Sequence, residues 1–87
     1  MSEYRVEVRV VPREGILDPQ GKAVAGALKS LGFGGVGEVH VGRLVTLGLS
    51  ADSAEAAETA ATEMCRQLLA NPVTEDFEVR VLEAAGR

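Results

Sequence analysis

The sequence is poor in aromatic residues and in cysteine, and it contains no tryptophan. Because only three aromatic side chains are present, we expect a core built from valine, leucine and alanine; they are Tyr4, Phe33 and Phe77. The single cysteine, Cys65, has no partner for a disulfide within the chain. Free thiols are typical of reducing compartments, so this usage predicts a cytoplasmic protein.

The chain also lacks an excess of positive charge and any long apolar run. Thirteen acidic residues against nine basic ones give a formal net charge of −4 at pH 7. Nucleic-acid phosphates require clustered lysine and arginine, so we expect no nucleic-acid partner. No stretch approaches the ~18 apolar residues of a membrane-spanning helix. The first residues, Met1–Arg5, also lack the apolar centre of a signal peptide, so we expect no membrane association.

What remains is sufficient for one small domain over residues 1–87. A chain of this length buries only about 60–65% of its unfolded surface, so its core is thin. Small domains of this kind often gain stability by pairing with a second chain. We therefore expect a homodimer or a higher homo-oligomer.

Two segments alternate between apolar and polar residues, as a strand with one buried face does. They are Tyr4–Val11, which ends before Pro12, and Phe77–Val81. The charged side chains share the opposite face of the expected sheet, which is a mixed-charge surface made of Arg5, Glu7, Arg9, Glu78 and Arg80.

A helix is expected to begin at the segment Asp18-Pro19-Gln20-Gly21. The Asp18 carboxylate suits an N-cap, because it can accept a bond from a free N–H of the first turn. Pro19 suits the first helical position, where its missing N–H costs nothing. Gly21 is unusual there, since glycine costs roughly 1 kcal/mol relative to alanine in a helix. Its presence indicates close packing, either by another part of the fold or by a partner chain.

The apolar residues that follow recur at helical spacing, and they are Val24, Leu28 and Leu31. Gly32 then suits the left-handed residue that ends a helix. Two short strands are expected next, Glu38–Val41 and Leu44–Leu49, joined by a type II′ turn at Gly42-Arg43.

A second helix is expected from Asp52, its N-cap, to the Asn71-Pro72 turn, because proline cannot continue a helix. Its apolar stripe is expected to comprise Ala57, Ala60, Ala61, Met64 and Leu68. The element order is then β-α-β-β-α-β. With two right-handed crossovers, this order predicts a ferredoxin-like α+β two-layer sandwich, in which an antiparallel sheet carries both helices on one face.

We find no residues arranged for catalysis, for a cofactor or for a metal. His40 and Cys65 lie in different elements, and no spacing suits zinc. Acylphosphatases of the same layout need a glycine-rich loop after the first strand, and here Arg13 stands without those glycines. RNA-binding modules need several stacking aromatics, whereas Tyr4 stands alone. A small-molecule regulatory domain of the ACT kind, with ligands bound at helix–strand junctions, stays open as an alternative.

Several stretches, in order and over nearly the whole chain, carry a more specific likeness. They are Val8–Arg13 leading to Gly15–Gly21, then Ala27–Phe33, Val39–Arg43 and Met64–Val73. Together they resemble the PurS family, the small subunits of phosphoribosylformylglycinamidine synthase in purine biosynthesis. Arg43 stands where that family commonly has a lysine, which keeps the charge but changes the donor geometry.

The resemblance implies an accessory subunit without catalytic residues of its own. In that family the complex uses ATP and glutamine to convert formylglycinamide ribonucleotide to formylglycinamidine ribonucleotide. A glutaminase subunit releases ammonia, and a large synthetase subunit uses ATP and Mg²⁺. The resemblance further implies that this chain bridges the two, helps ammonia transfer and binds no cofactor. The partner contacts implied by the resemblance are Asp18, Pro19, Gln20, Gly21, Asn71 and Pro72.

Overall fold

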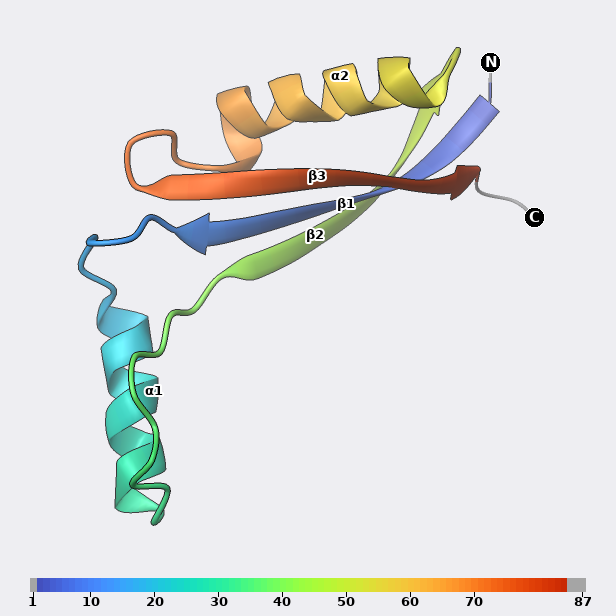
Figure 1. Cartoon of the computed structure of the whole chain (residues 1–87). Coiled ribbons are helices and arrows are strands. Elements are labelled where there is room, and N and C mark those ends of the chain that lie inside the picture. Colours follow the sequence, from blue (N-terminus) through green and yellow to red (C-terminus); the bar gives the residue numbers. More distant parts are fainter. Residues whose placement is uncertain (1, 85–87) are drawn as a thin grey trace.

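A computed structural model describes residues 2–84, in which three strands form one sheet (Figure 1). The elements follow the order β1 (Ser2–Pro12), α1 (Pro19–Ser30), β2 (Arg43–Ala51), α2 (Ala54–Met64), a π-helical turn η1 (Cys65–Leu69) and β3 (Glu75–Ala84). The strand order in the sheet is β2-β1-β3. Both outer strands run antiparallel to β1, with Val8 opposite Val45 on one side and Val79 on the other. The expected α+β class, with an antiparallel sheet and two helices, is confirmed.

The alternation of β1 produces one apolar face and one charged face. Val6, Val8 and Val10 are fully buried, and they form the core together with Ala61 and Cys65 of the α2–η1 helix. Small alanine side chains let α2 approach the sheet closely, which suits a core without large rings.

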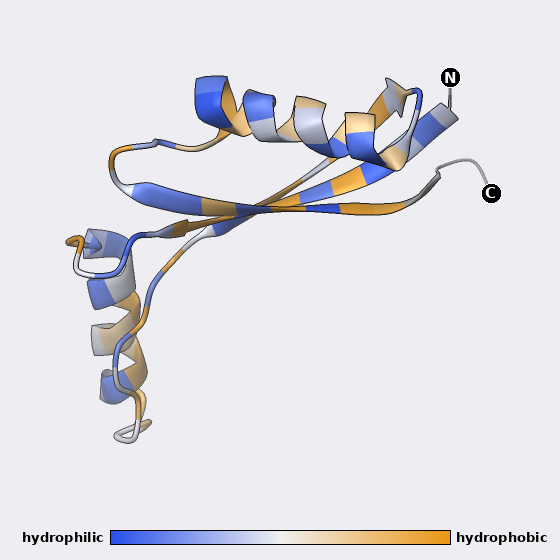
Figure 2. Cartoon of the chain, turned by 45° about the horizontal axis from the view of Figure 1, so that its top comes forward, coloured by the Kyte–Doolittle hydropathy of each residue, from blue (hydrophilic) through white to orange (hydrophobic). Residues whose placement is uncertain are grey.

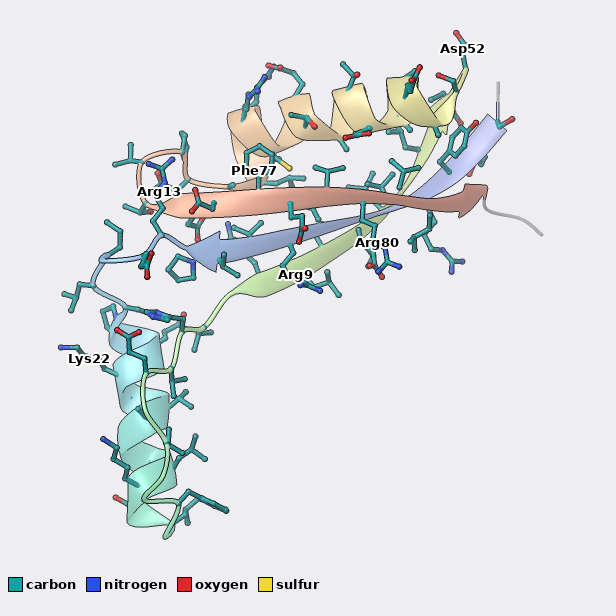
Figure 3. The ribbon with its side chains drawn as sticks, in the orientation of Figure 1. Arg9, Arg13, Lys22, Asp52, Phe77 and Arg80 are labelled. Atoms are coloured by element: carbon teal, nitrogen blue, oxygen red, sulfur yellow. The ribbon has the colours of Figure 1, made fainter. Side chains whose placement is uncertain are left out.

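On the opposite face of the sheet, charged side chains form loose ion pairs. Arg9 lies 4.0 Å from Glu78, and Arg80 lies 3.9 Å from Glu7. Figure 3 shows Arg9 and Arg80 on the side of the sheet away from Phe77 and α2. The mixed-charge surface predicted from the sequence is confirmed, and its exposure means that each pair contributes little to stability.

The strand expected at Glu38–Val41 and the turn expected at Gly42-Arg43 are both wrong. Residues 38–42 have no regular structure, and Arg43 is the first residue of β2. Among residues 2–84, positive φ angles occur only at Gly15 and Gly32, so no type II′ turn forms at Gly42. A side chain at Gly42 would overlap the carbonyl oxygen of Val10. Glycine is therefore needed here for a close approach to β1. Its presence was interpreted from the sequence as the first central residue of a turn.

The two helices do not share one face of the sheet within this chain. Only α2 lies on the apolar face, whereas α1 projects away from the end of the sheet (Figure 1). The molecule is consequently elongated and thin, measuring 51 × 30 × 15 Å along its principal axes. Periodicity shows which side of α1 is apolar, but it does not show which sheet that side packs against.

The ends of α1 agree with the sequence. Asp18 is its N-cap, Pro19 its first residue, and Gly32 follows it with φ +102°. The Phe33 N–H donates to the Leu28 carbonyl at 3.0 Å, which completes the expected C-terminal motif.

The expected N-cap and apolar stripe of the second helix both need correction. Its N-cap is Ser53 and not Asp52, because the Ser53 hydroxyl accepts from the Ala56 N–H at 3.0 Å. The π-helical turn rotates the following residues, so Leu68 of the expected stripe is 82% exposed, whereas Cys65 is fully buried. Within residues 2–84, neither α-helix has the length and apolarity needed to cross a bilayer.

Candidate partner interface

The Asp18 carboxylate fixes the start of α1 to the segment that returns from the helix. One oxygen accepts from the Gly21 N–H at 3.1 Å, and the other accepts from the Val41 N–H at 2.9 Å. His40 Nδ1 lies 3.5 Å from the second oxygen. The bonds from the Val41 and Gly21 backbone hold the pKa of Asp18 below its usual value, with a smaller effect of His40. The Asp18 side chain therefore bonds both to the first turn of α1 and to a residue 23 positions further along the chain.

Gly21 is buried, and the group that packs against it, the Val39 carbonyl, belongs to the same chain. A side chain at this position would overlap the Val39 carbonyl and would lie 2.7 Å from Asp18 Oδ2. Of the two explanations left open by the sequence, packing within the fold accounts for this glycine. Gly21 thus allows residues 39–41 to lie directly against the first turn of α1.

A cavity of about 220 Å³ opens beside this contact. Apolar groups of Ile16, Leu17 and Val39 line it, and charged groups of Lys22 and Glu38 stand at the same site. Drug-sized ligands occupy pockets of roughly 300–1,000 Å³, so this cavity suits only a small molecule or one inserted side chain.

A second cluster holds the turn between η1 and β3. The Arg43 guanidinium donates to both carboxylate oxygens of Glu75, at 2.8 and 3.0 Å, and to the Leu69 carbonyl at 2.7 Å. Glu75 also accepts from the Asn71 N–H at 2.8 Å. Arg43 first, and Asn71 second, hold the pKa of Glu75 below its usual value. The planar guanidinium fork makes these bonds together, which the single ammonium of a lysine does not do.

Arg13 supports the same turn from the end of β1. Its guanidinium donates to the Pro72 carbonyl at 2.7 Å and lies 3.2 Å from Asp76, and the backbone N–H of Arg13 donates to the Thr74 carbonyl at 2.9 Å. The Asn71 side chain accepts from the Val73 N–H at 2.9 Å. The turn is therefore held by four side chains, those of Arg13, Arg43, Asn71 and Glu75, although it lies at the surface.

Both clusters lie at one end of the sheet, where β1 ends and β2 and β3 begin; Figure 3 shows Arg13 and Lys22 there. We call this region the junction end, and it comprises residues 13–21, 39–43 and 69–75. The structure thus brings Asp18–Gly21 and Asn71-Pro72 to the same end of the molecule. Pro19, Gln20, Asn71 and Pro72 are exposed, whereas Gly21 is buried and Asp18 is 9% exposed in its side chain.

Sequence reasoning missed Arg13, Arg43 and Glu75 as members of this region. The one signal was Arg43 itself, whose difference from a lysine was noted but not connected to Glu75, 32 residues away. Within residues 2–84, no group of three or more His, Cys, Asp or Glu side chains is arranged to hold a metal ion.

Comparison with known proteins agrees with the resemblance found in the sequence. A family model described as "PurS: Phosphoribosylformylglycinamidine (FGAM) synthase" matches residues 5–83. A relative from Synechocystis, named phosphoribosylformylglycinamidine synthase subunit PurS, is 40% identical over 94% of this chain and 84% of its own length.

Solved structures match equally well. Bacillus subtilis PurS superposes with a TM-score of 0.82 at 40% identity, covering 92% of this chain and 99% of that one. A chain of the Thermotoga maritima PurLQS structure has a TM-score of 0.85 at 29% identity, covering 94% and 100%. The family match spans almost all described residues, and the chain therefore belongs to the PurS family, subunits of the phosphoribosylformylglycinamidine synthase of purine biosynthesis.

Proposed function

We propose that this chain is a non-catalytic subunit that bridges the glutaminase and synthetase subunits of the synthase and aids ammonia transfer between them. The observation that carries this proposal is the match over almost its full length to a chain of the PurLQS structure. In this proposal ATP and Mg²⁺ are used by the synthetase subunit, and this chain binds neither.

The junction end is the proposed contact region, with Asp18, Pro19, Gln20, Gly21, Asn71 and Pro72 as its residues. Two properties support this choice. Pro19, Gln20 and Pro72 are exposed, so a partner can reach them. The backbone beneath them is held by the bonds of Asp18 and of the two arginines. A rigid exposed surface loses little conformational entropy when it binds, which favours affinity.

A bridging role suits the chemistry of ammonia. Ammonia is small and reacts as the neutral base, and in water at neutral pH it is largely protonated. A subunit that closes the junction between the place of release and the place of use excludes water and limits this loss. Such a subunit raises the glutamine-dependent rate without contacting the reacting atoms.

The proposal includes a homodimer or higher homo-oligomer and a cytoplasmic assembly. The elongated shape and thin core of the single chain favour association with a second copy. The free thiol of Cys65 is usual for a protein of a reducing compartment.

Reconstitution with the two larger subunits tests the proposal. We expect omission of this chain to lower glutamine-dependent product formation much more than formation from added ammonium salt. In the presence of the chain, the double variant Gln20→Arg/Pro72→Arg should weaken binding to the larger subunits by about tenfold or more, as loss of a central contact does. The matched control is Ala56→Arg/Thr59→Arg, which adds the same two charges at exposed positions of α2.

Two results would contradict the proposal, the first its bridging role and the second its contact region. The first is equal glutamine-dependent activity of the two larger subunits with and without this chain. The second is unchanged binding of the Gln20→Arg/Pro72→Arg variant, which would move the contact away from the junction end.

The second candidate function is an ACT-like ligand-binding regulatory module, and the cavity beside Asp18 is the observation that favours it. It lies between the start of α1 and the irregular residues 37–40 that precede β2, and it presents both charge signs to a small zwitterion. Calorimetry of the isolated chain with amino acids and nucleotides distinguishes the two functions. Binding that Lys22→Ala abolishes would support the regulatory module.

A further inference from the structure

The charged face of the sheet carries a groove that the proposed contacts at the junction end do not use. Its volume is about 560 Å³, and residues of β1, β2 and β3 line it, among them Arg5, Glu7 and Leu82. Figure 2 shows hydrophilic and hydrophobic residues alternating along the strands, which gives the sheet one charged and one apolar face. Among the described residues, no charged or polar side chain is buried. The groove is therefore an open feature of the surface, unlike the enclosed pockets that hold small ligands.

Gly48 lies in the middle of β2 and contributes no side chain to this groove. Glycine weakens a strand, because it offers nothing to pack and loses much conformational freedom on folding. A glycine inside a strand often marks a bulge, a bend or the close approach of another group. The surroundings of Gly48 decide between these explanations.

The described part of the chain gives no internal reason for this glycine. The pairing of β1 with β2 runs along all of β2 without a shift, so no bulge forms at Gly48. Its φ angle is not positive. A side chain at Gly48 would meet no atom within 4 Å, whereas one at Gly21 or Gly42 would overlap backbone atoms. The group that needs the space above Gly48 must then come from outside the chain.

The basic groups of this face have the composition of a protein–protein interface. They are Arg5, Arg9 and Arg80, whereas both lysines of the chain lie on α1. Arginine is enriched and lysine is depleted in such interfaces. The pairs of Arg9 with Glu78, at 4.0 Å, and of Arg80 with Glu7, at 3.9 Å, are longer than hydrogen bonds. Their guanidinium groups therefore keep N–H donors that a partner can use.

Charge complementarity indicates which kind of partner fits the groove. Arginine side chains bind carboxylates most strongly, so the partner surface should be acidic. A second copy of this chain does not suit, because the carboxylates on its own face are already engaged. Glu7 and Glu78 pair with arginines, and Glu3 accepts from the Ser50 hydroxyl at 3.1 Å. The carboxylates must then belong to a different protein.

The groove lies far from the junction end along the sheet. Gly48 is opposite Arg5, and Pro12, seven residues further along β1, is opposite Glu75 of the junction end. At about 3.3 Å per residue, this separation is roughly 23 Å. In Figure 3, Arg80 likewise lies further from Arg13 than Arg9 does. A subunit that bridges two proteins needs two separate surfaces, and the groove supplies the second.

We propose that the groove beside Gly48 binds one of the two larger subunits of the synthase, while the junction end binds the other. This inference rests on the bridging role proposed above and adds a second contact surface to it. The partner segment carries aspartate or glutamate side chains that bond to Arg5 and Arg80, and an apolar side chain that enters the space above Gly48. Any side chain at Gly48 would keep that segment away, which explains a glycine that weakens its own strand.

Binding of the full-length chain to the two larger subunits, supplied separately and together, tests the proposal. Gly48→Tyr fills the groove, and we expect it to weaken binding to one larger subunit by about tenfold or more, as loss of a central contact does. Binding to the other subunit should not change. The urea midpoint of this variant should equal or exceed that of the wild type, because the added ring meets no atom and aromatic residues favour strands. The matched control is Thr59→Tyr, which adds the same side chain at an exposed position of α2.

Arg80→Gln tests the charge separately from the shape, and Arg66→Gln is its control. Both arginines are exposed and lie in long ion pairs, 3.9 Å from Glu7 and 3.7 Å from Glu63. Only Arg80→Gln should weaken binding to the same larger subunit, by about two- to fivefold. It should also reduce the dependence of that binding on salt concentration. This pair of variants decides the question even if Gly48→Tyr folds poorly.

Three results would overturn the proposal. Unchanged binding of Gly48→Tyr and Arg80→Gln to both larger subunits would show that the charged face is not a contact. A smaller homo-oligomer of Gly48→Tyr in light scattering would assign the groove to a contact between copies of this chain. Weaker binding to the same subunit in Gly48→Tyr and in Gln20→Arg/Pro72→Arg would give both surfaces to one partner. If Gly48→Tyr binds normally while the chain still raises the glutamine-dependent rate, the groove contact is wrong and the bridging role stands.

Discussion

Replacing Gly21 by alanine tests whether the contact between α1 and residues 39–41 holds the start of α1 in place. The added methyl group would overlap the Val39 carbonyl, which is backbone and cannot move aside as a flexible side chain can. Gly26 lies in the same helix with open space around it. The pair Gly21→Ala and Gly26→Ala therefore makes one chemical change in two surroundings.

The two variants should change stability in opposite directions. Forcing an extra methyl group into a close contact costs about 1–3 kcal/mol, and a backbone neighbour places this case in the upper half of that range. Alanine recovers up to ~1 kcal/mol over glycine in a helix. We expect Gly21→Ala to lower the free energy of unfolding by about 1–2 kcal/mol and Gly26→Ala to raise it by up to ~1 kcal/mol. In a domain of this size their Tm values should therefore differ by roughly 4–24 °C.

Urea unfolding at one protein concentration measures the difference, and amide hydrogen exchange locates it. Loss of the Asp18–Val41 bond should accelerate exchange of the Val41 N–H by about tenfold or more relative to the wild type. Exchange in β1 should change much less. If Gly21→Ala is as stable as Gly26→Ala and Val41 exchanges at its original rate, the close contact at the base of α1 does not exist.

Three further predictions concern the core and the second cluster. Asp18 and Glu75 have lowered pKa values in the folded chain. The free energy of unfolding should therefore be constant above pH ~5 and should fall as the pH passes below the ordinary pKa values of these groups, about 3.9 and 4.3. Glu75→Gln should weaken this acid dependence, which urea titrations at several pH values measure. Arg43→Lys should retain charge but lose the fork, so we expect it to fall between wild type and Arg43→Ala in urea midpoint, and a value below Arg43→Ala would contradict this. The thiol of Cys65 is fully buried with a raised pKa, so it should react with a thiol reagent only as the chain opens. Cys65→Ser should cost about 1–3 kcal/mol in thermal unfolding because it buries an unsatisfied hydroxyl, and an unchanged stability would refute the buried site.

The sequence identified the first strand and the two ends of α1, which depend on local chemistry. The alternation of β1 and the N-cap of α1 were both correct, because neighbouring residues decide them. The family resemblance was confirmed as well. The strand at 38–41 failed because Val41 bonds to Asp18 and not to a neighbouring strand. Such a long-range bond leaves no local pattern.

The candidate interface was predicted only in part for the same reason. Asp18–Gly21 and Asn71-Pro72 were chosen separately, and their common location follows from the antiparallel pairing of β1 with both outer strands. The arginines that support the turn were missed since each bonds to groups at least 26 residues away. The orientation of α1 was missed because amphipathicity shows that a helix has an apolar side but does not show where the helix lies relative to the sheet.

The short axis of the molecule is 15 Å, which leaves room for little more than one helix above one sheet. A body this thin has no interior that is remote from its surfaces, so β1 lies directly between α2 and the charged face. Two larger proteins held on opposite sides of it, one on the charged face and one on α2, would be separated by one layer of strands and one helix. A shift of β1 that accommodates one of these proteins would also move the surface that contacts the other. The effects of mutations on the two sides on binding should therefore not be independent.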